Sequence, residues 1–144
     1  ASEITFMIFE NDNWHPAGDP SGVGDPPIWS QIISIDDPSL TLFSGRYDAT
    51  TNIYFDLPTS LILDHGHYWM VVYPTMYFDP YSQFGRAHSD TNNGFIGQWI
   101  NPGGGYDMGT DWQSWAVLGE EAYDIAFRIE GEILYTTYVP LICN

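Results

Sequence analysis

The sequence has very little positive charge. Its 144 residues include 19 Asp and Glu, but the only basic residues are Arg46, Arg86 and Arg128, so lysine is absent and the formal net charge is -16. A surface with this charge repels phosphate backbones and anionic lipid headgroups, which argues against nucleic-acid binding and against binding to a membrane surface. We expect the partners to be cations, neutral polymers such as glycans, or other protein chains.

Cysteine and long apolar runs are also scarce. The single cysteine, Cys143, excludes a disulfide within the chain and is either a small apolar strand residue or an interchain attachment point. No run of about 18 apolar residues occurs, which argues against a membrane-inserted helix. The start at Ala1 lacks an initiator Met and a signal-peptide pattern, so we expect a secreted chain whose signal peptide has been removed and which works outside the cell or at its surface.

The motifs of common enzyme classes are missing. The chain contains no Gly-x-Ser-x-Gly elbow, no His-Glu-x-x-His helix motif and no phosphate-binding glycine loop. The adjacent acidic pairs Asp36-Asp37 and Glu120-Glu121 would point to opposite faces of a strand, unlike the facing carboxylates of a glycosidase. His65 and His67 share a face and either bind a transition metal or are ordinary solvated histidines. We therefore predict a protein that is not an enzyme.

Apolar residues are nevertheless abundant, and their spacing is typical of strands. The chain is 44% hydrophobic and 17% aromatic, which is ample for one domain with one core. Alternating or continuous apolar runs of strand length are separated by Gly, Pro, Asn and Asp, with almost no helical periodicity. The predicted strands are 3–10, 28–35, 40–43, 53–57, 67–73, 95–100, 112–117 and 123–130, together with the tail. This pattern predicts an antiparallel β-sandwich, jelly-roll or Ig-like, with about nine strands and little or no helix.

Three features of this strand pattern are specific predictions. The strand 3–10 should be covered on both faces, and the most apolar strand, 67–73, should be central. Residues 123–130 alternate most clearly and predict a half-buried strand. The stretches 11–27 and 74–93, which are rich in turn-forming residues, are predicted to be loops.

Four blocks of sequence, in this order, resemble a known module. They are Gly66 to Val72, Gln98 to Tyr106, Thr110 to Trp112 and Asp124 to Gly131. The succession is similar to a β-sandwich accessory module that recurs in large bacterial secreted and cell-surface proteins. The resemblance implies an accessory domain without assigned catalysis. The chain departs from that pattern in two ways. It lacks the cysteines that flank the position of Asp111, and it lacks the additional first strands, of the type Asp-Asp-Phe-x-Val-Pro. Without those first strands, the resemblance implies that one sheet is short of strands.

The tail beyond Gly131 supplies a candidate for the missing strand. We divide the chain into a sandwich domain, 1–131, and a C-terminal strand or tail, 132–144, whose Tyr-Val-Pro-Leu-Ile core resembles the Tyr-Leu-Pro-Leu-Val ending of secreted proteins from Chloroflexi-type bacteria. The tail is apolar on both faces, which is an aggregation hazard unless both are buried. Burying about five of its large side chains contributes roughly 8–15 kcal/mol before the entropy of ordering.

These observations predict a structural or adhesive building block that assembles itself. A terminal strand of one copy would complete the sandwich of the next by donor-strand exchange, and such a head-to-tail contact propagates into a filament. The predicted donor residues are Ile133, Tyr135, Val139, Leu141 and Ile142, and Ile4, Phe6 and Ile8 belong either to the groove or to an alternative donor. The alternatives are a tail that folds back on its own domain or that links to another domain.

Binding of a carbohydrate or of calcium is a further alternative. Trp14 and Trp112 are flanked by turn residues and are the best candidates for an exposed ring that stacks on a sugar, whereas Trp69 lies in mid-strand and should be structural. Asp12, Asp19 and Asp25 fall in one loop rich in the oxygen ligands that calcium prefers, although the loop does not match an EF-hand. Ordinary turn chemistry explains the same three residues equally well.

Overall fold

The protein is described from a computed structural model that covers residues 1–44, 51–77, 79, 88–89, 95–104, 109–114, 116, 124–125 and 127–132. In this part of the chain the named elements are all strands, and every strand pair is antiparallel. The strands are β1 (Glu3–Asp12), β2 (His15–Pro16), β3 (Trp29–Ser34), β4 (Leu40–Ser44), β5 (Thr51–Phe55), β6 (Tyr68–Thr75), β7 (His88–Ser89), β8 (Gln98–Trp99), β9 (Gln113–Ser114) and β10 (Asp124–Ile125). The predicted all-β antiparallel class is confirmed, and the closure into a two-sheet sandwich stays a prediction. Within these residues no helix has the length and the apolar character needed to cross a bilayer.

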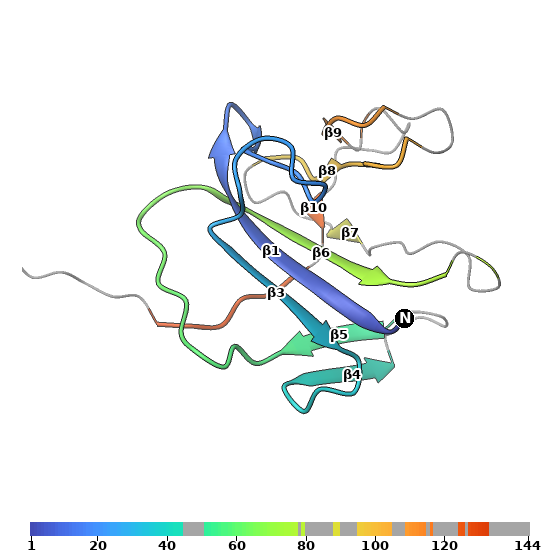
Figure 1. Ribbon diagram of the computed structural model, residues 1–144. Helices are drawn as coiled ribbons and strands as arrows, with labels where there is room; N and C mark the ends of the chain where they lie inside the picture. The colour runs from blue at the N-terminus through green and yellow to red at the C-terminus, as the bar shows by residue number, and fades with distance from the viewer. Residues whose placement is uncertain are drawn as a thin grey trace, which may run out of the picture.

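The central sheet is built around β1, which lies between β3 and β6 (Figure 1). Its register with β3 runs from Glu3 opposite Ser34 to Ile8 opposite Trp29. The register with β6 is longer and ends with Glu10 opposite Tyr68. β1 is therefore paired along both of its edges and is the inner strand of this sheet.

The two faces of β1 bury different side chains, because successive residues of a strand point to opposite faces. Ile4 is buried on one face, and Thr5 and Phe9 are buried on the other. Phe9 is completely buried and lies directly opposite Trp69 of β6. Both faces of the sheet thus contribute to the core.

The hairpin of β4 and β5 covers the face that carries Ile4. Leu40 forms the buried cluster together with Ile4 and Ile33, and Phe55 packs against this cluster. The rings of Phe6 and Phe55 stack with centroids 4.9 Å apart, which joins the hairpin to β1. Two layers of β-structure meet here, as a hydrophobic sheet face requires.

Several predicted elements differ from the observed ones. The strand predicted at 67–73 is present as β6, but in the described part of the chain it pairs only with β1 along its length, so β1 and not β6 is central. The predicted loop 11–27 contains β2, and the predicted loop 74–93 contains β7. Residues 127–132 form no strand, because there the chain has no pairing partner among the described residues.

The predicted donor residues Ile133, Tyr135, Val139, Leu141 and Ile142 lie outside the described residues, as does Cys143. The alternative donor residues are all described. Ile4 is buried, and Phe6 and Ile8 are half-buried. The part of β1 from Glu3 to Ile8 pairs with β3 on one edge and with β6 on the other.

Candidate functional site

A tight turn carries an exposed tryptophan at one end of the sheet. The strands β1 and β2 are joined by the two residues Asn13 and Trp14, with φ of 46° and 78°. Positive φ at both central residues is the geometry of a type I′ hairpin turn, which favours Gly at the second position. A tryptophan held there costs about 1–3 kcal/mol of backbone strain. Trp14 is also 65% exposed, so burial of its ring does not offset the strain.

Four rings from three segments form an aromatic cluster, which consists of Trp14, His67, Trp69 and Phe95. Phe95 is central: its ring centroid lies 4.2 Å from that of Trp14, 5.1 Å from His67 and 5.7 Å from Trp69. The indole N–H of Trp69 donates a hydrogen bond of 2.9 Å to Oδ1 of Asn11. Trp69 is therefore a packing residue, while Trp14 is held at the rim of the cluster in contact with solvent.

The loop 17–25 closes on itself next to this hairpin. Asp25 N–H donates to the carbonyl of Ala17 at 3.0 Å, and a β-bridge joins Gly18 to Gly24. A Cβ added to Gly18 would lie 1.9 Å from the carbonyl oxygen of Asp25, so the close approach of the two strands of the loop requires glycine. These contacts hold the loop 17–25 in one conformation. The sequence predicts only a loop of turn-forming residues here and does not show that the loop is closed on itself.

Asp19 fixes the tip of the same loop. Its Oδ1 accepts hydrogen bonds from Ser21 N–H at 2.7 Å, from the Ser21 hydroxyl at 2.6 Å and from Val23 N–H at 3.1 Å. Partial burial raises the pKa of Asp19, but these hydrogen bonds outweigh it and hold the pKa below its ordinary value. Asp19 is therefore a carboxylate at neutral pH and is engaged in turn chemistry.

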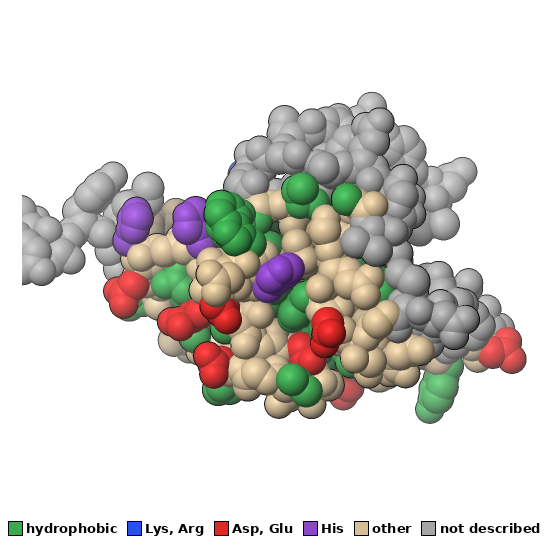
Figure 2. Space-filling view, turned by 90° about the horizontal axis from the view of Figure 1, so that it is seen from above, with side chains coloured by type: hydrophobic (Ala, Val, Ile, Leu, Met, Phe, Trp, Pro, Cys, Tyr) green, Lys and Arg blue, Asp and Glu red, His purple; other side chains and the backbone are tan. Residues whose placement is uncertain are grey.

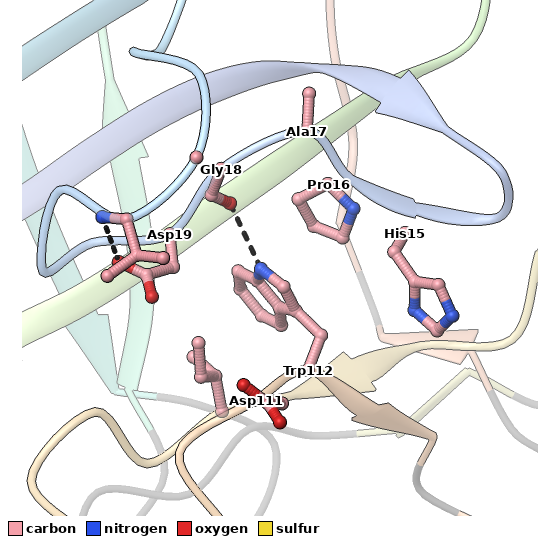
Figure 3. A pocket seen from close by; sticks show the side chains of 10 residues that line it. His15, Pro16, Ala17, Gly18, Asp19, Asp111 and Trp112 are labelled. Atoms are coloured by element: carbon pink, nitrogen blue, oxygen red, sulfur yellow. Dashed lines mark hydrogen bonds between the residues drawn. The ribbon is translucent and has the colours of Figure 1, made fainter.

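A pocket of about 370 Å³ opens between this loop and the segment that leads into β9 (Figure 3). One wall is formed by β2 and the loop, from His15 to Gly24, and the other by Ile100, Asp111 and Trp112. The indole N–H of Trp112 donates a 3.0 Å hydrogen bond to the carbonyl of Gly18, which lies 94 residues away in the sequence. This bond fixes the two walls relative to each other.

The pocket combines an aromatic ring with polar groups. His15 and Asp111 are exposed side chains at its surface, and Trp112 is half-buried. Among the described residues that line the pocket there is no Lys or Arg. In volume the pocket is at the lower end of the range that binds small molecules.

The two tryptophans predicted as glycan contacts are placed differently relative to the pocket. Trp112 lines the pocket, and Trp14 directly precedes the pocket residue His15. The ring contacts of the described residues do not pair Trp14 with Trp112. No sequence pattern indicates His15 and Asp111 as site residues, because only the fold brings these distant positions together.

The three predicted calcium ligands are not brought together. Within the described part of the chain, no group of three or more His, Cys, Asp or Glu side chains is placed to hold a metal ion. Asp12 accepts a hydrogen bond of 3.1 Å from the side chain of Asn13, Asp19 is engaged in its own turn, and the backbone of Asp25 closes the loop. Calcium binding at these residues stays a prediction.

The outer edge of β3 is a second candidate site. In the described part of the chain β3 pairs with β1 alone. The N–H of Ile35 donates to the carbonyl of Ser2, which lies opposite it in the register. Hydrogen-bonded and non-hydrogen-bonded pairs alternate in an antiparallel ladder, so the N–H groups of Ser30, Ile32 and Ser34 point to the outer edge.

This edge lacks the usual protection. Natural edge strands carry Lys, Pro or a bulge that discourages pairing with another chain. Between Trp29 and Ser34, β3 has neither a charged residue nor a proline, and its Ile32 side chain is 63% exposed. The edge therefore has the properties of an acceptor for an added strand.

The segment 127–132, which leads into the tail, is also exposed, and its residues 127–130 alternate apolar and charged side chains. Phe127 and Ile129 are 53% and 69% exposed. Arg128 and Glu130 form an ion pair of 2.8 Å, which places them on one side of the segment. All four residues are exposed, so the half-buried strand predicted at 123–130 is absent over 127–130.

Comparison with known proteins gives no relative: no family model, no curated protein and no solved structure matches this chain. The resemblance to the bacterial accessory module stays a prediction.

Proposed function

We propose that this chain is a secreted structural or adhesive building block of a cell surface, whose copies assemble into a filament by β-strand addition. The observation that carries the proposal is the outer edge of β3, which is unpaired in the described residues, is uncharged and carries the exposed side chain of Ile32. The donor is the tail 132–144 of a neighbouring copy. Main-chain hydrogen bonds to the edge supply affinity, and alternate side chains supply register.

The edge of β3 is a better acceptor than the edge of β6. All residues of β6 except Thr75 are partly buried, and Pro74 near its end has no N–H to donate. In β3 the exposure alternates, with Ser30, Ile32 and Ser34 exposed on one face. An added strand would therefore gain both free backbone groups and apolar contacts at β3.

The contact between copies is head-to-tail, because the tail and the β3 edge are different surfaces. Such contacts produce open chains of subunits unless they close into a ring. Acidic side chains are distributed over the surface, with exposed hydrophobic side chains between them (Figure 2). A charge of -16 on each copy opposes close approach, so assembly should be promoted by salt or by divalent cations.

Substitution of Ile32 by Lys tests the acceptor edge. Ile32 is exposed, so Ile32→Lys should change the free energy of unfolding by less than about 0.5 kcal/mol. A lysine on the edge should oppose strand addition and raise the concentration needed for assembly about tenfold or more, equivalent to about 1.4 kcal/mol. Sizing chromatography coupled to light scattering, over a dilution series at about 0.15 M salt, measures this shift.

The matched control is Ile62→Lys. Ile62 is 73% exposed in the segment between β5 and β6, and this substitution adds the same charge away from β3. We expect Ile62→Lys to assemble like the unsubstituted chain. Unchanged assembly of Ile32→Lys, or equal loss in both variants, would refute β3 as the acceptor.

A further inference from the structure

We propose that the pocket between the loop 17–25 and Trp112 binds a sugar unit of a neutral polysaccharide. This site is independent of strand addition, because none of its residues belongs to β3 or to the tail. The pocket, of about 370 Å³, has room for a sugar ring and its hydroxyl groups. It is open to solvent at His15 and Asp111, so a polymer chain can continue beyond it.

The first argument is that the walls of the pocket are fixed before a ligand arrives. The bridge between Gly18 and Gly24 closes the loop, and the hydrogen bonds accepted by Asp19 hold its tip. The hydrogen bond from Trp112 to the carbonyl of Gly18 joins the loop to the opposite wall. A site that is already ordered loses little conformational entropy on binding.

The second argument is the chemistry of the lining. Trp112, Val23 and Ile100 offer apolar surface for the C–H groups of a sugar ring, and aromatic rings favour such flat contacts. The carboxylates of Asp19 and Asp111 accept hydrogen bonds, which suits the donors of sugar hydroxyl groups. His15 has both a donor and an acceptor when its imidazole is neutral.

The third argument is that the negative charge of the pocket lining and of the whole chain limits the class of ligand. The described residues that line the pocket include two carboxylates and no Lys or Arg, and the chain has a net charge of -16. A phosphate, sulfate or uronate group would be repelled by this surface. The ligand is therefore a neutral sugar, and an acidic polysaccharide should not bind.

The fourth argument is the position of Trp14. This residue keeps a large exposed ring at a turn position with a φ of 78°, where glycine is favoured. Strained residues of this kind gather at functional sites. Trp14 directly precedes the pocket residue His15 in the sequence, and in this proposal a second sugar unit of the polymer stacks on its exposed ring.

Affinity electrophoresis of the full chain in native gels tests this proposal. The gels contain soluble starch, xyloglucan, galactomannan or mixed-linkage β-glucan, with polygalacturonate as the acidic polymer. We expect at least one neutral polymer to retard the protein and polygalacturonate to have no effect. Because the proposed ligand is uncharged, its affinity for the pocket should change less than about twofold when the salt concentration is raised tenfold.

Two substitutions locate the binding. Asp111→Ala removes an exposed carboxylate, and Trp14→Gly removes the ring while giving the turn its preferred residue, so both should fold. Each should weaken retardation by about tenfold, the effect of losing one charge-assisted hydrogen bond or one stacking contact. Tyr77→Ala removes an aromatic side chain that is exposed elsewhere and should leave retardation unchanged.

Three results would overturn the proposal. The first is that none of the neutral polymers retards the protein. The second is that Asp111→Ala and Trp14→Gly are retarded as strongly as the unsubstituted chain. The third is binding that weakens steeply with salt and is displaced by tetramethylammonium, because the pocket would then be a site for organic cations. None of these results bears on assembly, which Ile32→Lys measures separately.

Discussion

A chain that ends at Gly131 is expected to be monomeric under conditions in which the chain 1–144 forms filaments or large oligomers. The removed segment, 132–144, contains the proposed donor residues, and about five buried side chains contribute roughly 8–15 kcal/mol before ordering. The lost contribution is comparable to the whole free energy of association of a typical protein complex. Assembly should therefore not be detectable at any accessible protein concentration. Negative-stain electron microscopy and sizing chromatography of the two chains measure the difference.

Two controls separate strand donation from other effects of the tail. Cys143→Ser removes the only thiol and should leave the filaments intact, which excludes an interchain disulfide. Val139→Asp keeps the length of the tail but places a charge on its apolar face and should prevent assembly. Filaments formed equally by the chain ending at Gly131 would show that the tail is not the donor.

Replacing Ile33 by Ala is expected to cause the largest loss of stability among substitutions in β3. Ile33 is only 2% exposed and forms the buried cluster with Ile4 and Leu40. Truncation of a buried isoleucine costs about 2–5 kcal/mol, from lost transfer free energy and from the cavity that remains. This is a large fraction of the roughly 5–15 kcal/mol that stabilises a typical domain. Urea unfolding of the chain ending at Gly131, followed by tryptophan fluorescence, measures the change without assembly.

The adjacent residue provides the matched control. Ile32 has the same side chain but points to the exposed face, so Ile32→Ala should change the free energy of unfolding by less than about 0.5 kcal/mol. Equal losses in the two variants would show that β3 does not have the alternation seen here. A larger loss for Ile32→Ala would place the core on the opposite face of the sheet.

The main strands could be predicted from the sequence because their pattern is local. The strand beginning at Glu3 is apolar at successive positions, which indicates burial on both faces, and β1 has that burial. The order of strands within the sheet is not local. The highly apolar run at β6 suggested a central strand, but apolar content does not distinguish a strand with two neighbours from one whose faces are covered by loops and other strands.

The short strands β2 and β7 were missed, because two residues carry no periodicity, whereas β8, β9 and β10 lie within the longer strands predicted at 95–100, 112–117 and 123–130. The hairpin formed by β1 and β2 was missed for a specific reason: its turn is Asn13-Trp14, whereas the usual sequence signal is Asn-Gly. Residues 127–132 show the opposite error. Alternation there predicts a strand, but a strand also requires a neighbouring strand, and pairing depends on tertiary contacts.

The candidate pocket was only partly foreseen. Turn residues around Trp14 and Trp112 indicated rings near the surface; Trp112 lines the pocket, and Trp14 is exposed in the turn that precedes the pocket residue His15. The pairing of that loop with Asp111 depends on contacts across 94 residues, as in the hydrogen bond from Trp112 to Gly18. Such long-range contacts leave no short motif in the sequence. The oxygen-rich composition of the same loop predicts calcium, but in Asp19 the oxygen Oδ1 is already occupied by the turn that it stabilises.

The central claim is that residues 132–144 of one copy add to the outer edge of β3 of another. It is tested most directly by mixing the chain ending at Gly131 with a synthetic peptide of residues 132–144 and measuring amide hydrogen exchange by NMR. The account predicts that the peptide binds one to one and protects the amides of Ser30, Ile32 and Ser34, the groups that point away from β1. A peptide that fails to bind, or that protects other amides and leaves these three unchanged, would contradict it.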